Sequence, residues 1–264
     1  MNIAGEERIA AAFAGSGKRA ALMPYLMGGF PDLEGSLRIG AAAAAAGADM
    51  IELGIPFSDP LADGPVIHAA ATRALAAGAT VERVLEVAAA LAAQIPVIVM
   101  TYANIVIARG VDVFLDRLAQ AGVSGLIVPD LPFEEGAQTA EAAAAAGIAL
   151  VPLIAPTTTA ERLELIGARA RGFLYVVSVT GTTGERSQSG GDAVRALLER
   201  AHSATAVPVA LGFGISTPDQ AAAAADAGAD GVIVGSRLVR AAGEESDGAA
   251  AVGGLVAELA AALA

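Results

Sequence analysis

A helix-to-strand pattern repeats along the chain and constrains its fold more than any other feature. Alanine-rich segments end at Gly47, Gly122, Gly147 and Gly228, and a β-branched or leucine-rich segment begins a few residues after each. Glycine just past a helix end can adopt the left-handed conformation that closes the helix. The apolar run that follows is typical of a strand buried on both faces of a parallel sheet. The repeats therefore predict successive β/α units.

Eight such units can be counted along the sequence. We expect strands near positions 22, 50, 97, 126, 150, 175, 209 and 233, and an additional helix over residues 3–13. Eight units in about 250 residues are typical of a closed (β/α)8 TIM barrel. An open doubly wound sheet is the alternative, but no glycine-rich nucleotide fingerprint follows the first strand. With no linker-like stretch in residues 1–264, we expect a single α/β domain: a TIM barrel with an extra N-terminal helix.

Composition argues against several classes of function. The formal net charge is −12 and no Lys/Arg run is present, which disfavours binding to nucleic acid or anionic membranes. There is no cysteine, and His68 and His202 are the only histidines, so we expect no metal site and histidines that are exposed or hydrogen-bonded. No signal-peptide pattern is evident, and the longest apolar stretch is shorter than the roughly 20 residues of a membrane helix. We expect a cytoplasmic protein.

One copy of the repeat carries a carboxylate where two others carry isoleucine. The fifth residue after the glycine is Ile127 or Ile233 in those copies, but Glu52 in the first. Strand parity predicts that Glu52 points into the barrel, where an unpaired charge would cost several kcal/mol. Arg237 is the only arginine in or just after a predicted strand, so a structural ion pair is the weaker interpretation. We interpret Glu52 as a general acid/base whose pKa is raised by apolar surroundings.

The segment that begins at Glu52, ELGIPFSDPLADGP, continues as a stiff acidic loop. Its three prolines exclude a helix or a central strand. Aspartates in such loops often accept hydrogen bonds from their own backbone. Asp59 suits a turn, and Asp63 could cap the helix that begins near Val66. From the residues alone, both aspartates are therefore assigned to turns.

Glycines follow three predicted strands. Strand six leads into a segment without an apolar anchor between Gly181 and Gly191, which we interpret as a lid. Strands seven and eight end near Gly214 and Gly235, each followed by a helix. Helix N-termini at this end of a barrel often bind phosphate. The alternative is that these glycines only permit tight turns.

Other polar residues have simpler interpretations. Tyr25, Tyr102 and Tyr175 fall in or near predicted strands, where they fit the core or the wall of a flat ligand's site. Asp130, in PDLP, is expected to fix a loop.

Taken together, these motifs resemble the tryptophan synthase alpha subunit family. Besides ELGIPFSDPLADGP, the segments PYLMGGFPD, MTYANIV, GLIVPDLPFEE, YVVSVTGTTG, GFGIS and GVIVGS are similar to its landmarks and occur in the same order. The likeness covers essentially the whole chain. It implies a (β/α)8 lyase of tryptophan biosynthesis that cleaves indole-3-glycerol phosphate to indole and glyceraldehyde 3-phosphate, without cofactor or metal.

The resemblance also implies roles for individual residues. Glu52 would protonate the indole ring carbon at the bond to be broken. Asp63 would accept a hydrogen bond from the indole N–H, which reverses the turn assignment. Tyr175 would lie near the glycerol chain, and Thr183 would pack against Asp63 when the lid closes. The phosphate would bind at Gly184, Gly214, Gly235 and Ser236, and the indole pocket would be walled by Tyr25, Met100, Tyr102, Ile127, Phe213 and Ile233. Tyr25 and Met100 depart from the phenylalanine and leucine typical of the family.

A partner is implied as well. The beta subunit of this family is a pyridoxal-phosphate enzyme that joins indole to serine, and an alpha2beta2 heterotetramer is expected. The loop that carries Asp59 and the segment after strand six would carry signals between the subunits. Two alternatives stay open: the chain acts mainly as an allosteric partner with negligible activity alone, or it is another phosphate-binding barrel enzyme, such as an epimerase or isomerase.

Overall fold

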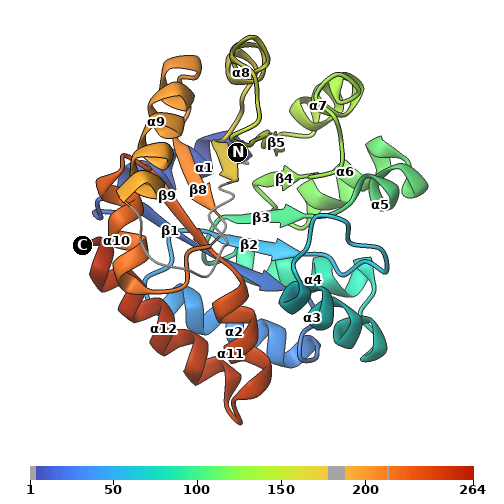
Figure 1. The fold of residues 1–264 in the computed structure, drawn as a ribbon. Coiled ribbons are helices and arrows are strands. Elements are labelled where there is room, and N and C mark those ends of the chain that lie inside the picture. The colour runs from blue at the N-terminus through green and yellow to red at the C-terminus, as the bar shows by residue number, and fades with distance from the viewer. Residues whose placement is uncertain (1–3, 178–187, 213) are drawn as a thin grey trace.

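The computed structural model describes residues 4–177, 188–212 and 214–264. Parallel strands form a ring at the centre of the molecule, and helices surround it (Figure 1). The strands are β1 (Ala21–Met27), β2 (Ile51–Gly54), β3 (Val97–Met100), β4 (Gly125–Ile127), β5 (Ala149–Leu150), β6 (Leu153–Ile154), β7 (Leu174–Val177), β8 (Val209–Gly212) and β9 (Gly231–Val234). The helices are α1 (Gly5–Gly15), α2 (Leu33–Ala45), α3 (Pro65–Ala76), α4 (Val81–Ala92), α5 (Ala103–Arg109), α6 (Val111–Gln120), α7 (Ala137–Ala145), α8 (Ala160–Ala168), α9 (Gln188–Ala204), α10 (Pro218–Asp226), α11 (Ser236–Glu244) and α12 (Gly248–Leu263).

The ring closes through the fifth predicted strand, which is divided into β5 and β6. The strand order is β5-β4-β3-β2-β1-β9-β8-β7-β6, so these two short strands stand at its ends. Only two residues separate them. The Val151 N–H donates to the Leu126 carbonyl at 2.9 Å, and the Pro152 carbonyl accepts from the Tyr175 N–H at 3.0 Å. The predicted TIM barrel is therefore confirmed, and its fifth strand pairs with one neighbour before Pro152 and with the other after it.

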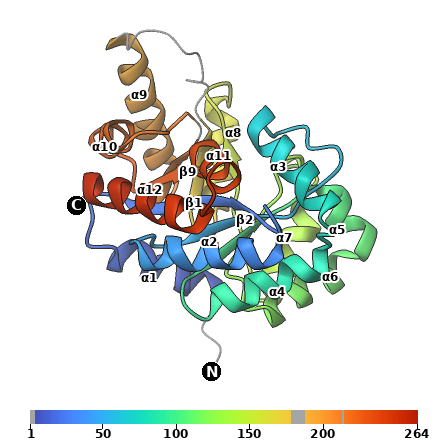
Figure 2. The ribbon, with the colours of Figure 1, turned by 90° about the horizontal axis from the view of Figure 1, so that it is seen from below.

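Helix α1 lies at the end of the barrel formed by the amino ends of the strands. The Gly5 N–H donates to the Gly147 carbonyl at 2.9 Å. Ile9, with none of its surface exposed, packs against Gly125 and Gly172. In Figure 2, α1 lies on the side where the N-terminus emerges, while α3 lies on the opposite side. The extra N-terminal helix predicted from the sequence thus closes one end, and the site is built at the other.

Left-handed glycines end the repeated helices, as the sequence predicts. The φ angles are 102° at Gly47, 70° at Gly122, 74° at Gly147 and 102° at Gly228. A side chain other than glycine is strained in this region, so these four positions fix where each helix stops and the next strand begins.

Small side chains let the outer helices pack closely. α2 and α12 form the most extensive helix–helix contact, and a Cβ at Gly40 of α2 would overlap Leu91 of α4.

Among the described helices, none combines the length and the hydrophobicity that a membrane span needs.

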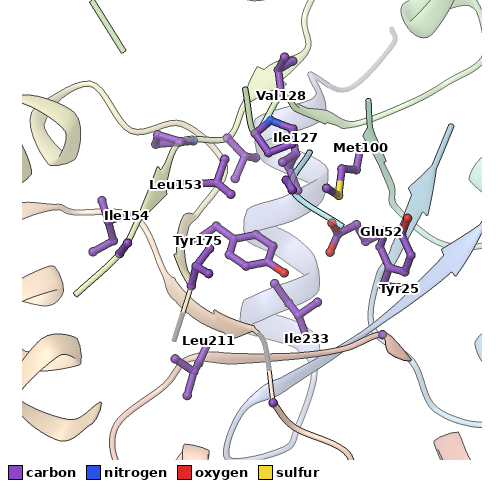
Figure 3. Close-up of a pocket in the computed structure, with 18 of the residues that line it drawn as sticks. Tyr25, Glu52, Met100, Ile127, Val128, Leu153, Ile154, Tyr175, Leu211 and Ile233 are labelled. Atoms are coloured by element: carbon purple, nitrogen blue, oxygen red, sulfur yellow. The ribbon is translucent and has the colours of Figure 1, made fainter. Parts of the chain in front are cut away.

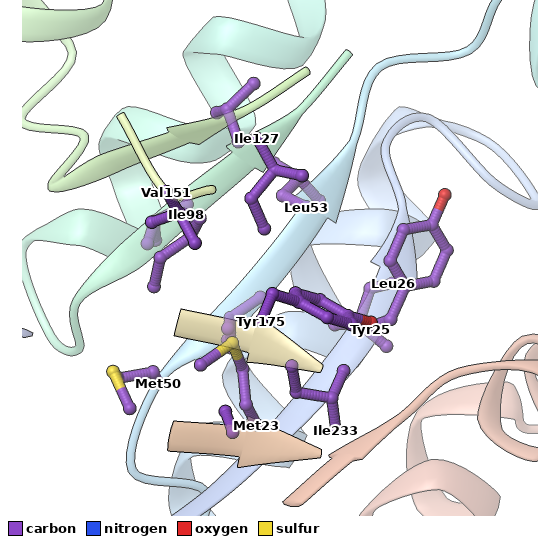
Figure 4. Close-up of a cluster of buried hydrophobic side chains, with 14 of the residues drawn as sticks. Met23, Tyr25, Leu26, Met50, Leu53, Ile98, Ile127, Val151, Tyr175 and Ile233 are labelled. Carbon is purple, nitrogen blue, oxygen red and sulfur yellow. The ribbon is translucent and has the colours of Figure 1, made fainter. Parts of the chain in front are cut away.

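Side chains from several strands fill the barrel interior. Met23, Met50 and Ile98 lie deep, and Tyr25 and Tyr175 lie closer to the carboxyl ends of the strands (Figure 4). Strand register places residue 25 beside residue 52, and residue 52 beside residue 98. Glu52 therefore shares the inward face with these apolar neighbours, as strand parity predicts.

Candidate active site

Glu52 is the one charged side chain that is buried within the described residues, with 1% of its surface exposed. Among the described residues its Oε2 atom has no hydrogen-bond partner, which argues against the structural ion-pair interpretation. Burial, with a further contribution from the nearby Asp63 charge, raises the pKa of Glu52 from 4.5 to about 8. At neutral pH the Glu52 carboxyl therefore keeps its proton and can donate it.

The carboxyl faces a cavity of about 1870 Å³ at the carboxyl ends of the strands. Figure 3 shows the Glu52 carboxylate between Tyr25 and Tyr175, with Met100 and Ile127 on the neighbouring wall. Residues with predicted roles that line this cavity are Tyr25, Glu52, Asp63, Met100, Ile127, Tyr175, Gly214, Ile233, Gly235 and Ser236. Thr183, Gly184, Phe213 and most of the predicted lid lie outside the described residues.

Asp63 reaches the cavity from the acidic loop. It does not cap α3, because that helix begins at Pro65 after Gly64 and has no side-chain cap. Burial raises the pKa of Asp63 to about 6, and a hydrogen bond with Tyr102 and the charge of His68 oppose the rise. At pH 7 the two carboxyl groups thus differ: Asp63 is mainly ionised, while Glu52 is mainly protonated.

Tyr102 supports the acidic loop from beneath. Its hydroxyl accepts a hydrogen bond from the Ala62 N–H at 3.2 Å, and its ring stacks on Phe57 with 5.3 Å between centroids. It is 3% exposed and lies behind the loop rather than in the cavity wall. The loop therefore rests on a side chain from the end of β3, and this contact sets the position of Asp63.

Asp59 and Asp130 take the roles expected of loop aspartates. The Ser58 hydroxyl donates to Asp59 Oδ2 at 2.6 Å. Asp130 Oδ1 accepts from the Ala103 N–H at 2.8 Å and so fixes the start of α5. The histidines are also as predicted, because His68 is exposed and His202 Nε2 bonds to the Gly228 carbonyl at 2.9 Å.

Two glycines make room for the inward tyrosines, and sequence reasoning did not identify this role. A Cβ at Gly54 would overlap the Tyr25 hydroxyl, and a Cβ at Gly212 would overlap the Tyr175 hydroxyl. Both tyrosine pKa values lie well above 10, chiefly because of burial, so both hydroxyls stay protonated. Each glycine stands two residues beyond the tyrosine's register partner on the next strand. This offset is the signal that could have identified them once the strands were aligned.

A helix N-terminus opens onto the far side of the cavity. Gly235 and Ser236 begin α11, which has no side-chain cap, and Arg237 lines the cavity beside them. By contrast, the first turn of α10 is satisfied by a reciprocal capping box between Thr217 and Gln220. The unsatisfied N–H groups of α11 can therefore bind an anion.

Comparisons with known proteins agree with this geometry. The model of the family described as "Tryptophan synthase alpha chain" matches residues 12–262. The tryptophan synthase alpha chain of Prochlorococcus marinus (strain MIT 9313) is 52% identical over 242 residues, covering 91% of this chain and 86% of the relative. The solved tryptophan synthase subunit alpha of Legionella pneumophila str. Paris is 33% identical with a TM-score of 0.88, covering 99% of this chain and 98% of that one. A chain of Mycobacterium tuberculosis tryptophan synthase is 39% identical with a TM-score of 0.87, covering 97% and 98%.

Proposed function

The chain belongs to the tryptophan synthase alpha chain family, and we propose that Glu52 and Asp63 are the carboxyl groups with which it cleaves indole-3-glycerol phosphate. The reaction is a retro-aldol cleavage that yields indole and glyceraldehyde 3-phosphate. Membership of this family excludes the alternative of an unrelated phosphate-binding isomerase or epimerase. The observation that carries the residue roles is the buried Glu52 carboxyl, which faces the cavity and whose Oε2 atom has no partner among the described residues.

Glu52 supplies the proton that starts the reaction. With a pKa of about 8, it is neutral at pH 7 and donates its proton to the indole ring carbon that carries the glycerol chain. The ring becomes an indoleninium, whose positive charge is shared with the ring nitrogen. General acid catalysis by a positioned side chain contributes about 10²–10⁴-fold to a rate.

Asp63 stabilises that charged intermediate. Its carboxylate, with a pKa of about 6, accepts a hydrogen bond from the indole N–H. Glu52, now ionised, takes the proton of the glycerol hydroxyl next to the scissile bond. The carbon–carbon bond breaks, its electron pair returns to the ring as neutral indole, and the hydroxyl carbon becomes the aldehyde.

The phosphate of the substrate is assigned to the N-terminus of α11. Gly235 and Ser236 offer N–H groups that no side chain of the described residues caps, and Gly214, with a φ of 79°, turns the chain at the same cavity. The exposed Arg237 adds positive charge at the same mouth. An anion is favoured at this helix end in spite of the net charge of −12, because oriented N–H groups act locally.

Members of this family pair with a beta subunit, and for this chain we propose an alpha2beta2 heterotetramer. Two large apolar side chains near the site support a protein partner: Leu61 of the acidic loop is 91% exposed, and Ile107 of α5 is 64% exposed. The mass of the complex formed with the beta subunit tests the stoichiometry, and a complex of any other composition would refute it.

Indole release from indole-3-glycerol phosphate tests the catalytic roles. We expect Glu52→Gln to lower turnover by about 10³-fold while substrate binding is preserved, and the same change at the exposed Glu86 of α4 to have no effect. Turnover retained in Glu52→Gln would remove Glu52 from the acid/base role. Assays with and without the beta subunit separate a lyase from a purely allosteric partner, which would release no indole in either case.

A further inference from the structure

Tyr25 carries a polar group at the centre of the site that has no role in the scheme above. Strand register places Tyr25 directly beside Glu52. On the other side, a Cβ at Gly235 would be 3.4 Å from the Tyr25 Cβ, while the hydroxyl lies over Gly54. The side chain thus extends from the proposed phosphate site to the end of β2, where the acidic loop begins. Figure 3 shows the Tyr25 ring beside the Glu52 carboxyl group.

The charges of both carboxyl groups, Asp63 and Glu52, act on the Tyr25 hydroxyl. Tyr25 is 7% exposed and lines the cavity, and its hydroxyl makes no hydrogen bond to the described residues. After burial, the charges of Asp63 and then Glu52 contribute most to raising its pKa. A hydroxyl at the cavity wall can donate a hydrogen bond, and its bond to a carboxylate is stronger than its bond to a neutral acceptor.

Asp63 is the better acceptor for this donor. Glu52 must hold its own proton for the reaction and is fixed on a strand. Asp63 must be ionised, and it sits half-buried on a loop and lines the same cavity as Tyr25. A carboxylate can accept several hydrogen bonds, so a bond with Tyr102 leaves sites for a second donor.

We propose that Tyr25 is a positioning residue for the reaction: its hydroxyl donates a hydrogen bond to the Asp63 carboxylate and, together with Tyr102, holds Asp63 charged beside a protonated Glu52. This inference rests on the roles proposed above for the two carboxyl groups. Within the part of the chain that the structure describes, the titratable groups that face Asp63 are Glu52 on β2, Tyr25 on β1, Tyr102 after β3 and His68 on α3. The two phenols are the uncharged donors of this set and favour the ionised form of Asp63.

The substitution Tyr25→Phe tests the proposal because it keeps the ring and removes only the hydroxyl. Without this donor, the pKa of Asp63 rises toward that of Glu52. We expect the acid limb of the pH profile of kcat/KM to move up by about 0.5–1 pH unit, and the rate at pH 6 to fall about 3–10-fold. The alkaline limb, which reports Glu52, stays within about 0.3 pH unit of the wild-type value.

Tyr175→Phe is the matched control. The Tyr175 hydroxyl also sits over a glycine of the neighbouring strand, but its pKa responds to Glu52 and not to Asp63. We therefore expect its acid limb to match that of the wild type. A carbon-13 NMR titration of the Asp63 carboxyl, identified by its loss in Asp63→Asn, gives the same comparison without turnover.

The outcomes separate this inference from the proposed function. An acid limb and an Asp63 midpoint unchanged in Tyr25→Phe, or changed equally in Tyr175→Phe, would overturn the role of Tyr25. A raised Asp63 midpoint in a protein that releases no indole would refute the proposed function and support the hydrogen bond. Indole release by the wild type, with an Asp63 midpoint that does not move in Tyr25→Phe, would support the proposed function and refute the hydrogen bond.

Discussion

Replacing Glu52 by glutamine should stabilise the protein increasingly as the pH rises. In the folded chain the pKa of Glu52 is raised from 4.5 to about 8 by burial and by Asp63. Between these values the folded state keeps a proton that the unfolded state has lost, so the stability of the wild type falls as pH rises. Glutamine has a similar shape and no titratable proton, so the variant lacks this loss.

The size of the effect follows from the two pKa values. Each pH unit between 4.5 and about 8 is worth about 1.4 kcal/mol of unfolding free energy. Counted from its value at low pH, the difference in unfolding free energy between Glu52→Gln and the wild type should therefore grow by about 1 kcal/mol at pH 5, about 3 kcal/mol at pH 7 and close to 5 kcal/mol at pH 8.5. The glutamine amide introduces an unpaired donor, but that penalty is the same at every pH and leaves the slope intact.

Urea unfolding followed by circular dichroism at these three pH values measures the difference. Glu86→Gln, an exposed glutamate on α4, is the matched control and should stay within about 0.5 kcal/mol of the wild type throughout. A difference between Glu52→Gln and wild type that does not grow with pH would show that Glu52 ionises normally in the folded chain. That result would refute the reasoning from burial.

Two further changes test the packing that supports the site. Gly54→Ala should destabilise the fold by about 1–3 kcal/mol, because its Cβ would overlap the Tyr25 hydroxyl. Gly254→Ala, at an exposed position of α12 with open space around it, should stabilise the fold by about 0.5–1 kcal/mol. Thermal unfolding measures both variants, and equal effects would contradict the role of Gly54. Asp49→Asn should cost about 3 kcal/mol, because Asp49 accepts from Lys18 Nζ at 2.9 Å and from the Leu22 N–H at 2.7 Å at the closed end of the barrel. A loss below about 1 kcal/mol in urea unfolding would show that the partly buried pair behaves like a surface ion pair.

The barrel could be predicted because its determinants are local. The glycine after each alanine-rich helix marks where that helix ends, and the same signal recurs at Gly47, Gly122, Gly147 and Gly228. Glu52 could be found for the same reason, since it interrupts a pattern set by its own chain. The division of the fifth strand was not predicted, although Pro152, which lacks an N–H, stands at the break.

The role of Asp63 could not be read from its neighbours in sequence. A loop aspartate before glycine and proline is usually a turn residue. What distinguishes Asp63 is its surroundings, which come from β1, the end of β3 and α3. The same holds for Gly54 and Gly212, because only the register of adjacent strands shows which tyrosine lies over each glycine.

Direct titration of the Glu52 carboxyl tests the central claim that the barrel holds a protonated acid over the cavity at neutral pH. Carbon-13 labelled glutamate gives one carboxyl signal for each residue, and its absence in Glu52→Gln identifies Glu52. The midpoint should lie near the value of about 8 that burial imposes. A midpoint near the ordinary value of 4.5 would mean that Glu52 is ionised at pH 7 and has no proton to give to the indole ring.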